Sequence, residues 1–207
     1  MPVGLRSLSS AVLGRRPPQS SLTPMRLQLL LLLLSVGLSA VEEGPFPVLD
    51  VIDGGTIEIQ RDGKLERVRL LYVDAPEVPD NDDGEAFTEG HVAKILLGLM
   101  LGEKASVRLW APGASLTRDP NDRLLACPIP DGWHKSPEEP IELSSLQVAI
   151  IRHGLSPYWR KYGDAPEPLH TKLMGCQSTA EAAKHGFWET APDWMRDEEN
   201  ERTAPQP

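Results

Sequence analysis

The chain has 207 residues and a formal net charge of −9, and 40% of the residues are hydrophobic, enough for one buried core. Residues 1–41 hold four arginines and no acidic residue, so the remainder carries a net charge of −13. An acidic surface repels polyanions, which excludes nucleic-acid binding through overall charge and requires a local arginine site instead. The five histidines lack the spacing of a zinc site.

Residues 1–40 are predicted to be a secretory signal peptide, with Met25 as a possible true start. Arg26 precedes seven leucines within residues 27–34, and small residues lead to a cleavage position near Ala40. This apolar run is shorter than the roughly 20 residues that cross a bilayer. We therefore expect a secreted or periplasmic monomer with no stable membrane association after cleavage. An uncleaved segment that anchors the protein in a membrane is the alternative.

Five segments downstream have the alternation or apolar content of strands. They are 48–51, 56–60, 67–73, 105–110 and 123–129. Two turn sequences, Asp53-Gly54-Gly55 and Arg61-Asp62-Gly63-Lys64, separate the first three segments and predict a meander.

Three further segments have apolar residues at helical spacing, and each ends at a glycine. They are 84–101, 143–153 and 166–185. Five strands with about three appended helices predict an α+β fold, a closed five-stranded barrel of the OB type. We expect this domain to cover residues 46–190. The acidic, proline-containing residues 191–207 are predicted to be a disordered tail.

The spacing of Arg69, Asp74 and Glu77 indicates a polar site at a strand end. In an extended strand alternate residues share a face, and Pro76 would end the strand and turn Glu77 back over it. Two carboxylates and a guanidinium would then surround one pocket at the barrel rim. A surface salt bridge at a strand end is the alternative that the spacing leaves open.

Several motifs in the same order resemble the staphylococcal-nuclease family. VRLLYVDAPE at 68–77 is similar to the family's RLxxVDxPE core, DPNDRLLA at 119–126 to its D-x-x-G-R-x-L-A segment, and AEAAKHGFW at 180–188 to its C-terminal helix. The resemblance runs from about Val48 to Trp188. It implies an OB-type barrel that hydrolyses phosphodiester bonds of nucleic acid at a calcium site.

The resemblance implies catalytic roles for Arg69, Glu77 and Arg123. Glu77 would act as a general base on water. Arg69 and Arg123 would neutralise charge growing on the phosphoryl oxygens, because a guanidinium is planar and always charged. The products would be 3′-phosphate-ended fragments of DNA or RNA. For Arg123 the alternative is a strand-start arginine paired with Asp119 or Asp122.

The metal set implied by the resemblance is incomplete. Ca²⁺ binds six to eight oxygens. Asp74 and the backbone carbonyl of Ala75 match ligand positions, whereas Gly55 stands where the family's DGDT turn has an aspartate. Asp53 is expected to substitute, with Ca²⁺ or another divalent cation bound more weakly. The alternative for Asp53-Gly54-Gly55 is a tight turn that needs positive φ.

Two smaller sets complete the sequence-based expectations. Tyr158 and Tyr162 offer faces on which a nucleic-acid base could stack, with ordinary packing as the alternative. Cys127 and Cys176 are the only cysteines, and they form either a disulfide or two unpaired thiols.

These features predict an exported nuclease with nucleic acid as its substrate. The main alternative is a pseudo-nuclease, a barrel that binds nucleic acid or a protein partner without cutting, because Gly55 removes a metal ligand. A third hypothesis is a protein-interaction module that uses the acidic tail and the proline-rich loop at 131–141.

Overall fold

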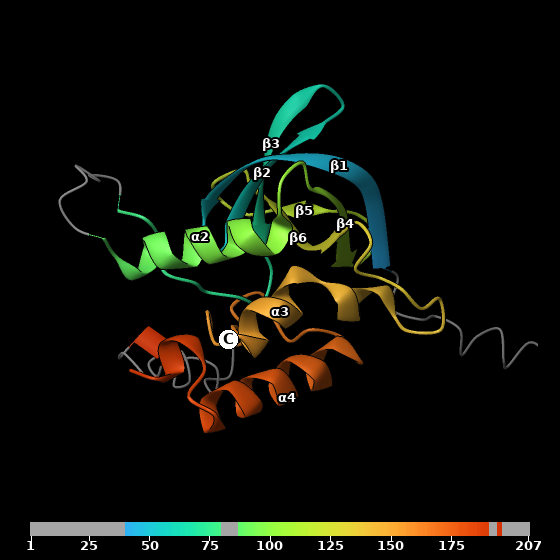
Figure 1. Cartoon of the computed structure of the whole chain (residues 1–207). Coiled ribbons are helices and arrows are strands. Elements are labelled where there is room, and N and C mark those ends of the chain that lie inside the picture. The colour runs from blue at the N-terminus through green and yellow to red at the C-terminus, as the bar shows by residue number, and fades with distance from the viewer. Residues whose placement is uncertain (1–39, 80–86, 191–193, 196–207) are drawn as a thin grey trace, which may run out of the picture. The chain divides into compact units, whose positions relative to one another are not determined.

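The structure is a computed structural model that describes residues 40–79, 87–190 and 194–195, and the predicted signal peptide lies outside them except for Ala40. In Figure 1 the orange helices near the C-terminus lie below a set of curved strands, and the green helix lies across the strands. The strands are β1 (Ala40–Asp53), β2 (Thr56–Arg61), β3 (Lys64–Leu70), β4 (Ser106–Pro112), β5 (Thr117–Arg118) and β6 (Leu124–Pro130). The helices are α2 (Glu89–Leu101), α3 (Leu146–Arg152) and α4 (Leu169–Ala182), with short 3₁₀ helices η1 (Ile141–Ser144) and η2 (Gly186–Trp188).

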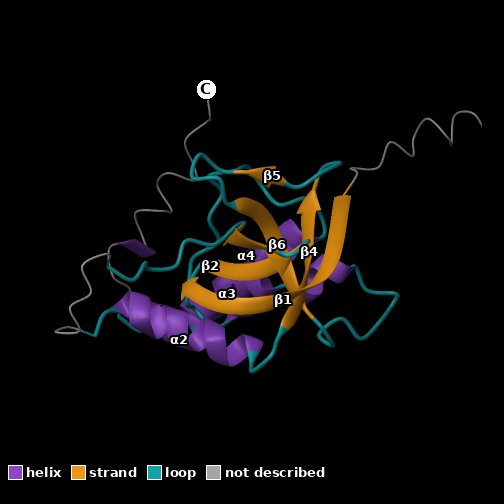
Figure 2. Ribbon diagram, turned by 90° about the horizontal axis from the view of Figure 1, so that it is seen from above, coloured by secondary structure: helices purple, strands orange, loops and turns teal. Residues whose placement is uncertain are grey.

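Five of the strands close into a barrel. Their order is β3-β2-β1-β4-β6, and a parallel pairing between β3 and β6 closes the ring. The long strand β1 pairs with β4 through its first half and with β2 through its second half, so it bends around the barrel (Figure 2). The two-residue strand β5 pairs only with β6, outside the ring. The predicted α+β fold, a five-stranded OB-type barrel with three helices, is confirmed.

The two predicted turns differ in their backbone. Asp62 and Gly63, between β2 and β3, both have positive φ, of 52° and 76°. This is the type I′ geometry that an Asp-Gly pair favours in a two-residue hairpin. In the turn between β1 and β2, neither Gly54 nor Gly55 has positive φ. The alternative that this turn needs positive φ is therefore wrong.

The first strand is longer than predicted and β3 is shorter. β1 begins at Ala40, and its ladder with β4 has a register shift between Glu43 and Phe46, where Pro45 has no N–H to donate. β3 ends at Leu70 rather than Val73, because Tyr72 has a φ of 65° that a strand cannot accommodate. The chain therefore leaves the barrel before Pro76, which corrects the predicted position of the break.

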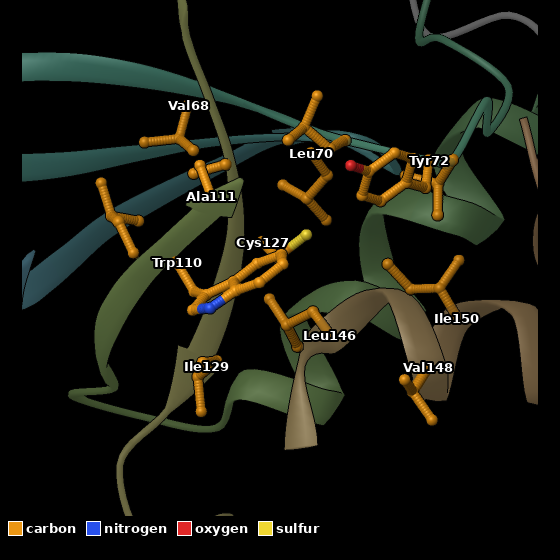
Figure 3. Packing of buried hydrophobic residues seen from close by; sticks show 14 of the residues in the cluster. Val68, Leu70, Tyr72, Trp110, Ala111, Cys127, Ile129, Leu146, Val148 and Ile150 are labelled. Carbon is orange, nitrogen blue, oxygen red and sulfur yellow. The ribbon is translucent and has the colours of Figure 1, made fainter. Parts of the chain in front are cut away.

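The main core lies between the barrel and α3. Figure 3 shows Val68 and Leu70 from β3 facing Trp110 from β4, with α3 side chains, including Leu146, closing the interior. These side chains are at most 5% exposed. Truncating a residue such as Leu146 to alanine would cost about 2–5 kcal/mol, from lost transfer energy and a cavity.

Cys127 and Cys176 are free, buried thiols, so the structure has the unpaired alternative and not the disulfide. Cys127 lies in β6 opposite Trp110, whereas Cys176 lies in α4. α4 packs on α3, and α3 packs on β6. Burial raises the pKa of Cys127 well above its ordinary value, so this thiol stays neutral.

Two residues of the predicted disordered tail are ordered in the described part of the chain. Met195 is fully buried in a small cluster with Ala180 and Trp188. Trp194 donates its indole N–H to Glu89 Oε2 at 2.8 Å, at the start of α2. The prediction of disorder is wrong for these two residues, whose apolar surface packs against α4 and η2. The remaining residues of the predicted tail lie outside the described part, and within that part no helix is long and apolar enough to cross a membrane.

Candidate functional site

Arg69 lies near the end of β3, between β2 and β6. Its Cα partners are Thr56 in β2 and Leu125 in β6. The side chain is only 4% exposed, and Nη2 donates to Asp74 Oδ1 at 2.7 Å and to the Val73 carbonyl at 3.2 Å. The early end of β3 turns Val73 and Asp74 back onto the arginine. The predicted proximity of Arg69 and Asp74 is therefore present, through a turn rather than a shared strand face.

The segment after α3 supports this turn. Trp159 donates its backbone N–H to the Tyr72 carbonyl at 3.0 Å, and the Asp74 N–H is donated to Ser156 Oγ at 2.7 Å. The Arg69 guanidinium lies over the Trp159 ring, with Cζ 5.5 Å from the ring centroid. This distance is within the range of cation–π attraction. Chain segments about 85 residues apart thus hold the arginine in place.

The turn between β1 and β2 contacts the same guanidinium. Asp53 is buried, and its Oδ1 accepts the Gly55 N–H at 2.7 Å. A Cβ built on Gly55 would lie 2.1 Å from Arg69 Nη1, and one on Gly54 would lie 2.8 Å from the Ala75 Cβ. Gly54 and Gly55 are thus required by close packing. Gly54 lies against Ala75, and Gly55 lies against Arg69 and Asp53.

Arg69 Nη1 is buried and, among the described residues, has no hydrogen-bond partner. A buried charged N–H group without a partner is costly, because it has lost its water and gained nothing in exchange. The nitrogen lies against Gly55, where a Cβ would be only 2.1 Å away. An acceptor oxygen within hydrogen-bond distance would satisfy this donor.

Arg123 reaches the same end of the barrel from the start of β6. Its Nε and Nη2 donate to Asp119 Oδ2 at 2.8 and 2.7 Å, and its Nη1 lies 3.5 Å from the Thr56 hydroxyl. Asp119 Oδ1 also accepts the backbone N–H groups of Asn121 and Arg123. Burial of Asp119 raises its pKa, but these hydrogen bonds outweigh burial, so the net pKa is below the ordinary value. The sequence-based alternative of a pair with Asp119 is present.

Glu77 is the predicted site residue with the fewest contacts. It is exposed, and within the described ranges its side chain forms no hydrogen bond or ion pair. Its backbone carbonyl lies so close to α2 that a Cβ on Gly90 would be 2.0 Å away. The segment that carries Glu77 is therefore seated on α2, while the carboxylate faces solvent and is free to hold a water molecule.

The two predicted stacking tyrosines have different surroundings. Tyr158 is buried, its hydroxyl lies 2.9 Å from His170 Nδ1, and it accepts the Ala165 N–H at 2.8 Å. Burial raises the pKa of Tyr158 to about 12. Because its ring is enclosed, the predicted stacking role of Tyr158 is wrong. Tyr162 is 39% exposed and packs edge-on against Trp159 at 5.8 Å, so its ring remains accessible.

The residues predicted to bind Ca²⁺ do not fit that ion in this arrangement. Asp74 is paired with Arg69, and one oxygen of Asp53 is used by the turn. Within residues 40–79, 87–190 and 194–195, no three His, Cys, Asp or Glu side chains are grouped as metal ligands. Two engaged carboxylates and the Ala75 carbonyl fall short of the six to eight oxygens of a calcium site.

Sequence reasoning did not assign their observed roles to three residues that build the site, although it named Trp159 beside Tyr158 and Tyr162 as a face for base stacking. Trp159 covers Arg69, Ser156 holds Asp74, and Thr56 lies between the two arginines. Thr56 directly follows the Asp53-Gly54-Gly55 motif, which was the available signal for it. The other two come from a distant segment whose place in the fold no local pattern indicates.

Comparison with known proteins gives one partial relationship, and no family model matches the chain. The chain is 36% identical over 66 residues to the thermonuclease of Staphylococcus hyicus. The match covers 28% of this chain and 39% of that enzyme, so it spans well under half of its length. This partial similarity, together with the five-stranded barrel, is consistent with a nuclease-like OB fold.

Proposed function

We propose that this protein is a nuclease that hydrolyses phosphodiester bonds in DNA or RNA. The observation that carries the proposal is Arg69, a buried guanidinium with an unpartnered Nη1 next to Thr56 and Arg123. Two guanidinium groups at one barrel end match a phosphodiester, which presents two anionic oxygens. The partial similarity to a thermonuclease supports the same reaction.

The proposed reaction uses Glu77 as the general base. Glu77 accepts a proton from water, the water oxygen bonds to phosphorus, the bond to the leaving oxygen breaks, and that oxygen takes a proton from solvent. Arg69 and Arg123 stabilise the negative charge that gathers on the phosphoryl oxygens. Tyr162 offers an exposed ring for the adjacent base.

We also propose where the protein is located and which alternative to catalysis it has. Export to the periplasm or the exterior is inferred from the signal-peptide pattern, which lies outside the described residues apart from Ala40, and the mature protein is proposed to be a monomer. The proposed reaction does not include the Ca²⁺ that the family resemblance implies, because the carboxylates of Asp53 and Asp74 are engaged by the protein itself. The second candidate, a pseudo-nuclease that binds nucleic acid or a protein without cutting it, is favoured by Gly55.

Cleavage of single-stranded DNA and RNA by the mature protein tests the proposal. Glu77→Gln is expected to lower the rate by about 10²-fold or more, because water activation is lost. Glu139→Gln is a matched control, with the same charge change on an exposed loop residue. A folded wild type that cleaves neither polymer would favour the pseudo-nuclease. Full activity in Glu77→Gln would show that Glu77 is not the base.

A further inference from the structure

We infer that the site at Arg69 binds phosphate without a divalent cation. This inference rests on the proposed function in taking a phosphodiester as the ligand. It goes beyond that function because it assigns to Arg69 the position that a metal-binding side chain at residue 55 would occupy. Gly55 is then a partner of the arginine rather than only a lost ligand.

Position 55 has no room for a side chain beside Arg69. A Cβ at position 55 would lie 2.1 Å from Arg69 Nη1 and 3.3 Å from Cζ, far inside van der Waals contact. The arginine can hold its observed conformation, between the Trp159 ring and Asp74, only with glycine at position 55. A side chain at that position would push the guanidinium away.

The positive charge of Arg69 lies between the carboxylates of Asp53 and Asp74. Nη2 of Arg69 already neutralises Asp74 at 2.7 Å, and Nη1 extends toward the turn that contains Asp53. A divalent cation between these carboxylates would lie beside a fixed positive charge and would compete with it for Asp74. Like charges at such separations repel strongly in a partly buried site. The guanidinium thus supplies the positive charge at this place.

The N–H donors of Arg69 and Arg123 suit the oxygens of a phosphoryl group. The unpartnered Nη1 is a donor, so it cannot coordinate a cation, and it needs an acceptor oxygen. Arg123 Nη1, 3.5 Å from the Thr56 hydroxyl, brings a second donor to the same barrel end. Two guanidinium donors bind phosphoryl oxygens through charge-assisted hydrogen bonds. Neither donor requires a metal ion to be present.

Calorimetric titration of the mature protein with a nucleoside 3′,5′-bisphosphate, in chelator and in millimolar calcium chloride, tests the inference. We expect the two dissociation constants to agree within about twofold. Arg69→Lys should weaken binding about tenfold in both buffers, because the planar fork is lost. A dissociation constant at least about tenfold tighter in calcium would overturn the inference, as would an absence of binding in chelator.

Two substitutions at position 55 sharpen the test. Gly55→Asp displaces the guanidinium and adds a carboxylate, so binding should become tighter in calcium than in chelator. Gly55→Asn has nearly the same volume without the charge, and should weaken binding equally in both buffers. If calcium strengthens binding to wild type and Gly55→Asp to the same degree, the arginine does not replace the ion.

Cleavage of single-stranded DNA in the same two buffers separates this inference from the proposed function. Equal cleavage in chelator and calcium supports both. Cleavage only in calcium overturns the inference and leaves the nuclease proposal intact. If the bisphosphate binds equally in chelator and in calcium but DNA is not cleaved, the inference holds and the nuclease proposal is overturned. Absence of both cleavage and binding overturns both.

Discussion

Arg69 and Arg123 lie at the same end of the barrel, yet opposite members of their ion pairs are buried. The Arg69 side chain is 4% exposed and its partner Asp74 is 34% exposed. The Arg123 side chain is 20% exposed and its partner Asp119 is 1% exposed. In the first pair the protein encloses the cation, and in the second it encloses the anion.

This difference indicates how the two arginines contribute. Arg69 is held by Asp74, the Val73 carbonyl and the Trp159 ring, and its Nη1 is buried without a hydrogen-bond partner among the described residues. Arg123 uses two of its nitrogens on Asp119, so only Nη1 is available to substrate. We expect Arg69 to contribute more to catalysis, and Asp119 to contribute more to stability than Asp74.

The largest effect is expected from Arg69→Lys. Lysine cannot reach Asp74, the Val73 carbonyl and a phosphoryl oxygen together, so cleavage should fall by about 10²- to 10³-fold. Steady-state cleavage of DNA measures this loss. Circular dichroism must show an unchanged fold, and a loss of activity smaller than that of Arg123→Lys would reverse the comparison.

Asp119→Ala should have the next largest effect, on stability. It removes hydrogen bonds to Asn121 and Arg123 and leaves a half-buried guanidinium without its partner, at a cost of about 3 kcal/mol. Urea denaturation measures the free energy of unfolding. Asp119→Asn, which keeps the backbone contacts, should lose about half as much. Asp74→Ala should lose less than Asp119→Ala, because within the described residues the Asp74 carboxylate accepts a hydrogen bond from Arg69 alone, whereas Asp119 also accepts two backbone N–H groups. The opposite order would contradict the comparison.

Arg123→Lys should reduce cleavage by about 10- to 100-fold, because one charge-assisted hydrogen bond to the phosphoryl group is lost. The reduction should be smaller than for Arg69→Lys. A double variant of Arg69 and Arg123 measures whether the two losses add, and a strongly non-additive result would mean that they act on the same oxygen.

The Asp119 pair also predicts a dependence of stability on pH. The pKa of Asp119 is lowered in the folded protein, so its contribution is complete above the ordinary aspartate pKa of about 3.9 and is lost as pH falls through the folded value. The stability difference between wild type and Asp119→Asn should therefore be largest above about pH 5 and shrink below about pH 4. Denaturation series at several pH values test this, and a constant difference would contradict it.

The smallest effect is expected from Trp159→Leu. Loss of the cation–π contact with Arg69 should cost about 1 kcal/mol, or roughly a fivefold drop in cleavage. Tyr162→Leu removes the neighbouring ring, on which the base is proposed to stack, and leaves Arg69 untouched, so it should raise KM more than it lowers kcat. Equal effects of the two substitutions would assign both rings to substrate stacking instead.

Much of the barrel was predictable because its signals are local. Alternation predicted the strands, the Asp62-Gly63 pair predicted a turn between β2 and β3, and glycines followed the ends of α2 and α3, whereas α4 ends at Ala182, before the predicted Gly186. These features depend on backbone preferences and side-chain periodicity within a few residues. Residues whose role depends on contacts across the barrel, such as Trp159 and Cys176, could not be placed in this way.

The sequence by itself determined that Arg69, Asp74, Glu77 and Arg123 are present at their spacing, and that position 55 has no side chain. Only the tertiary structure decided the consequence of that glycine. Pairing of β2 with β3 brings Gly55 against Arg69, and the segment with Trp159 packs on the turn after β3. Contacts between distant segments form because closing the barrel buries apolar surface over the whole domain, and that global gain selects positions that no local pattern encodes.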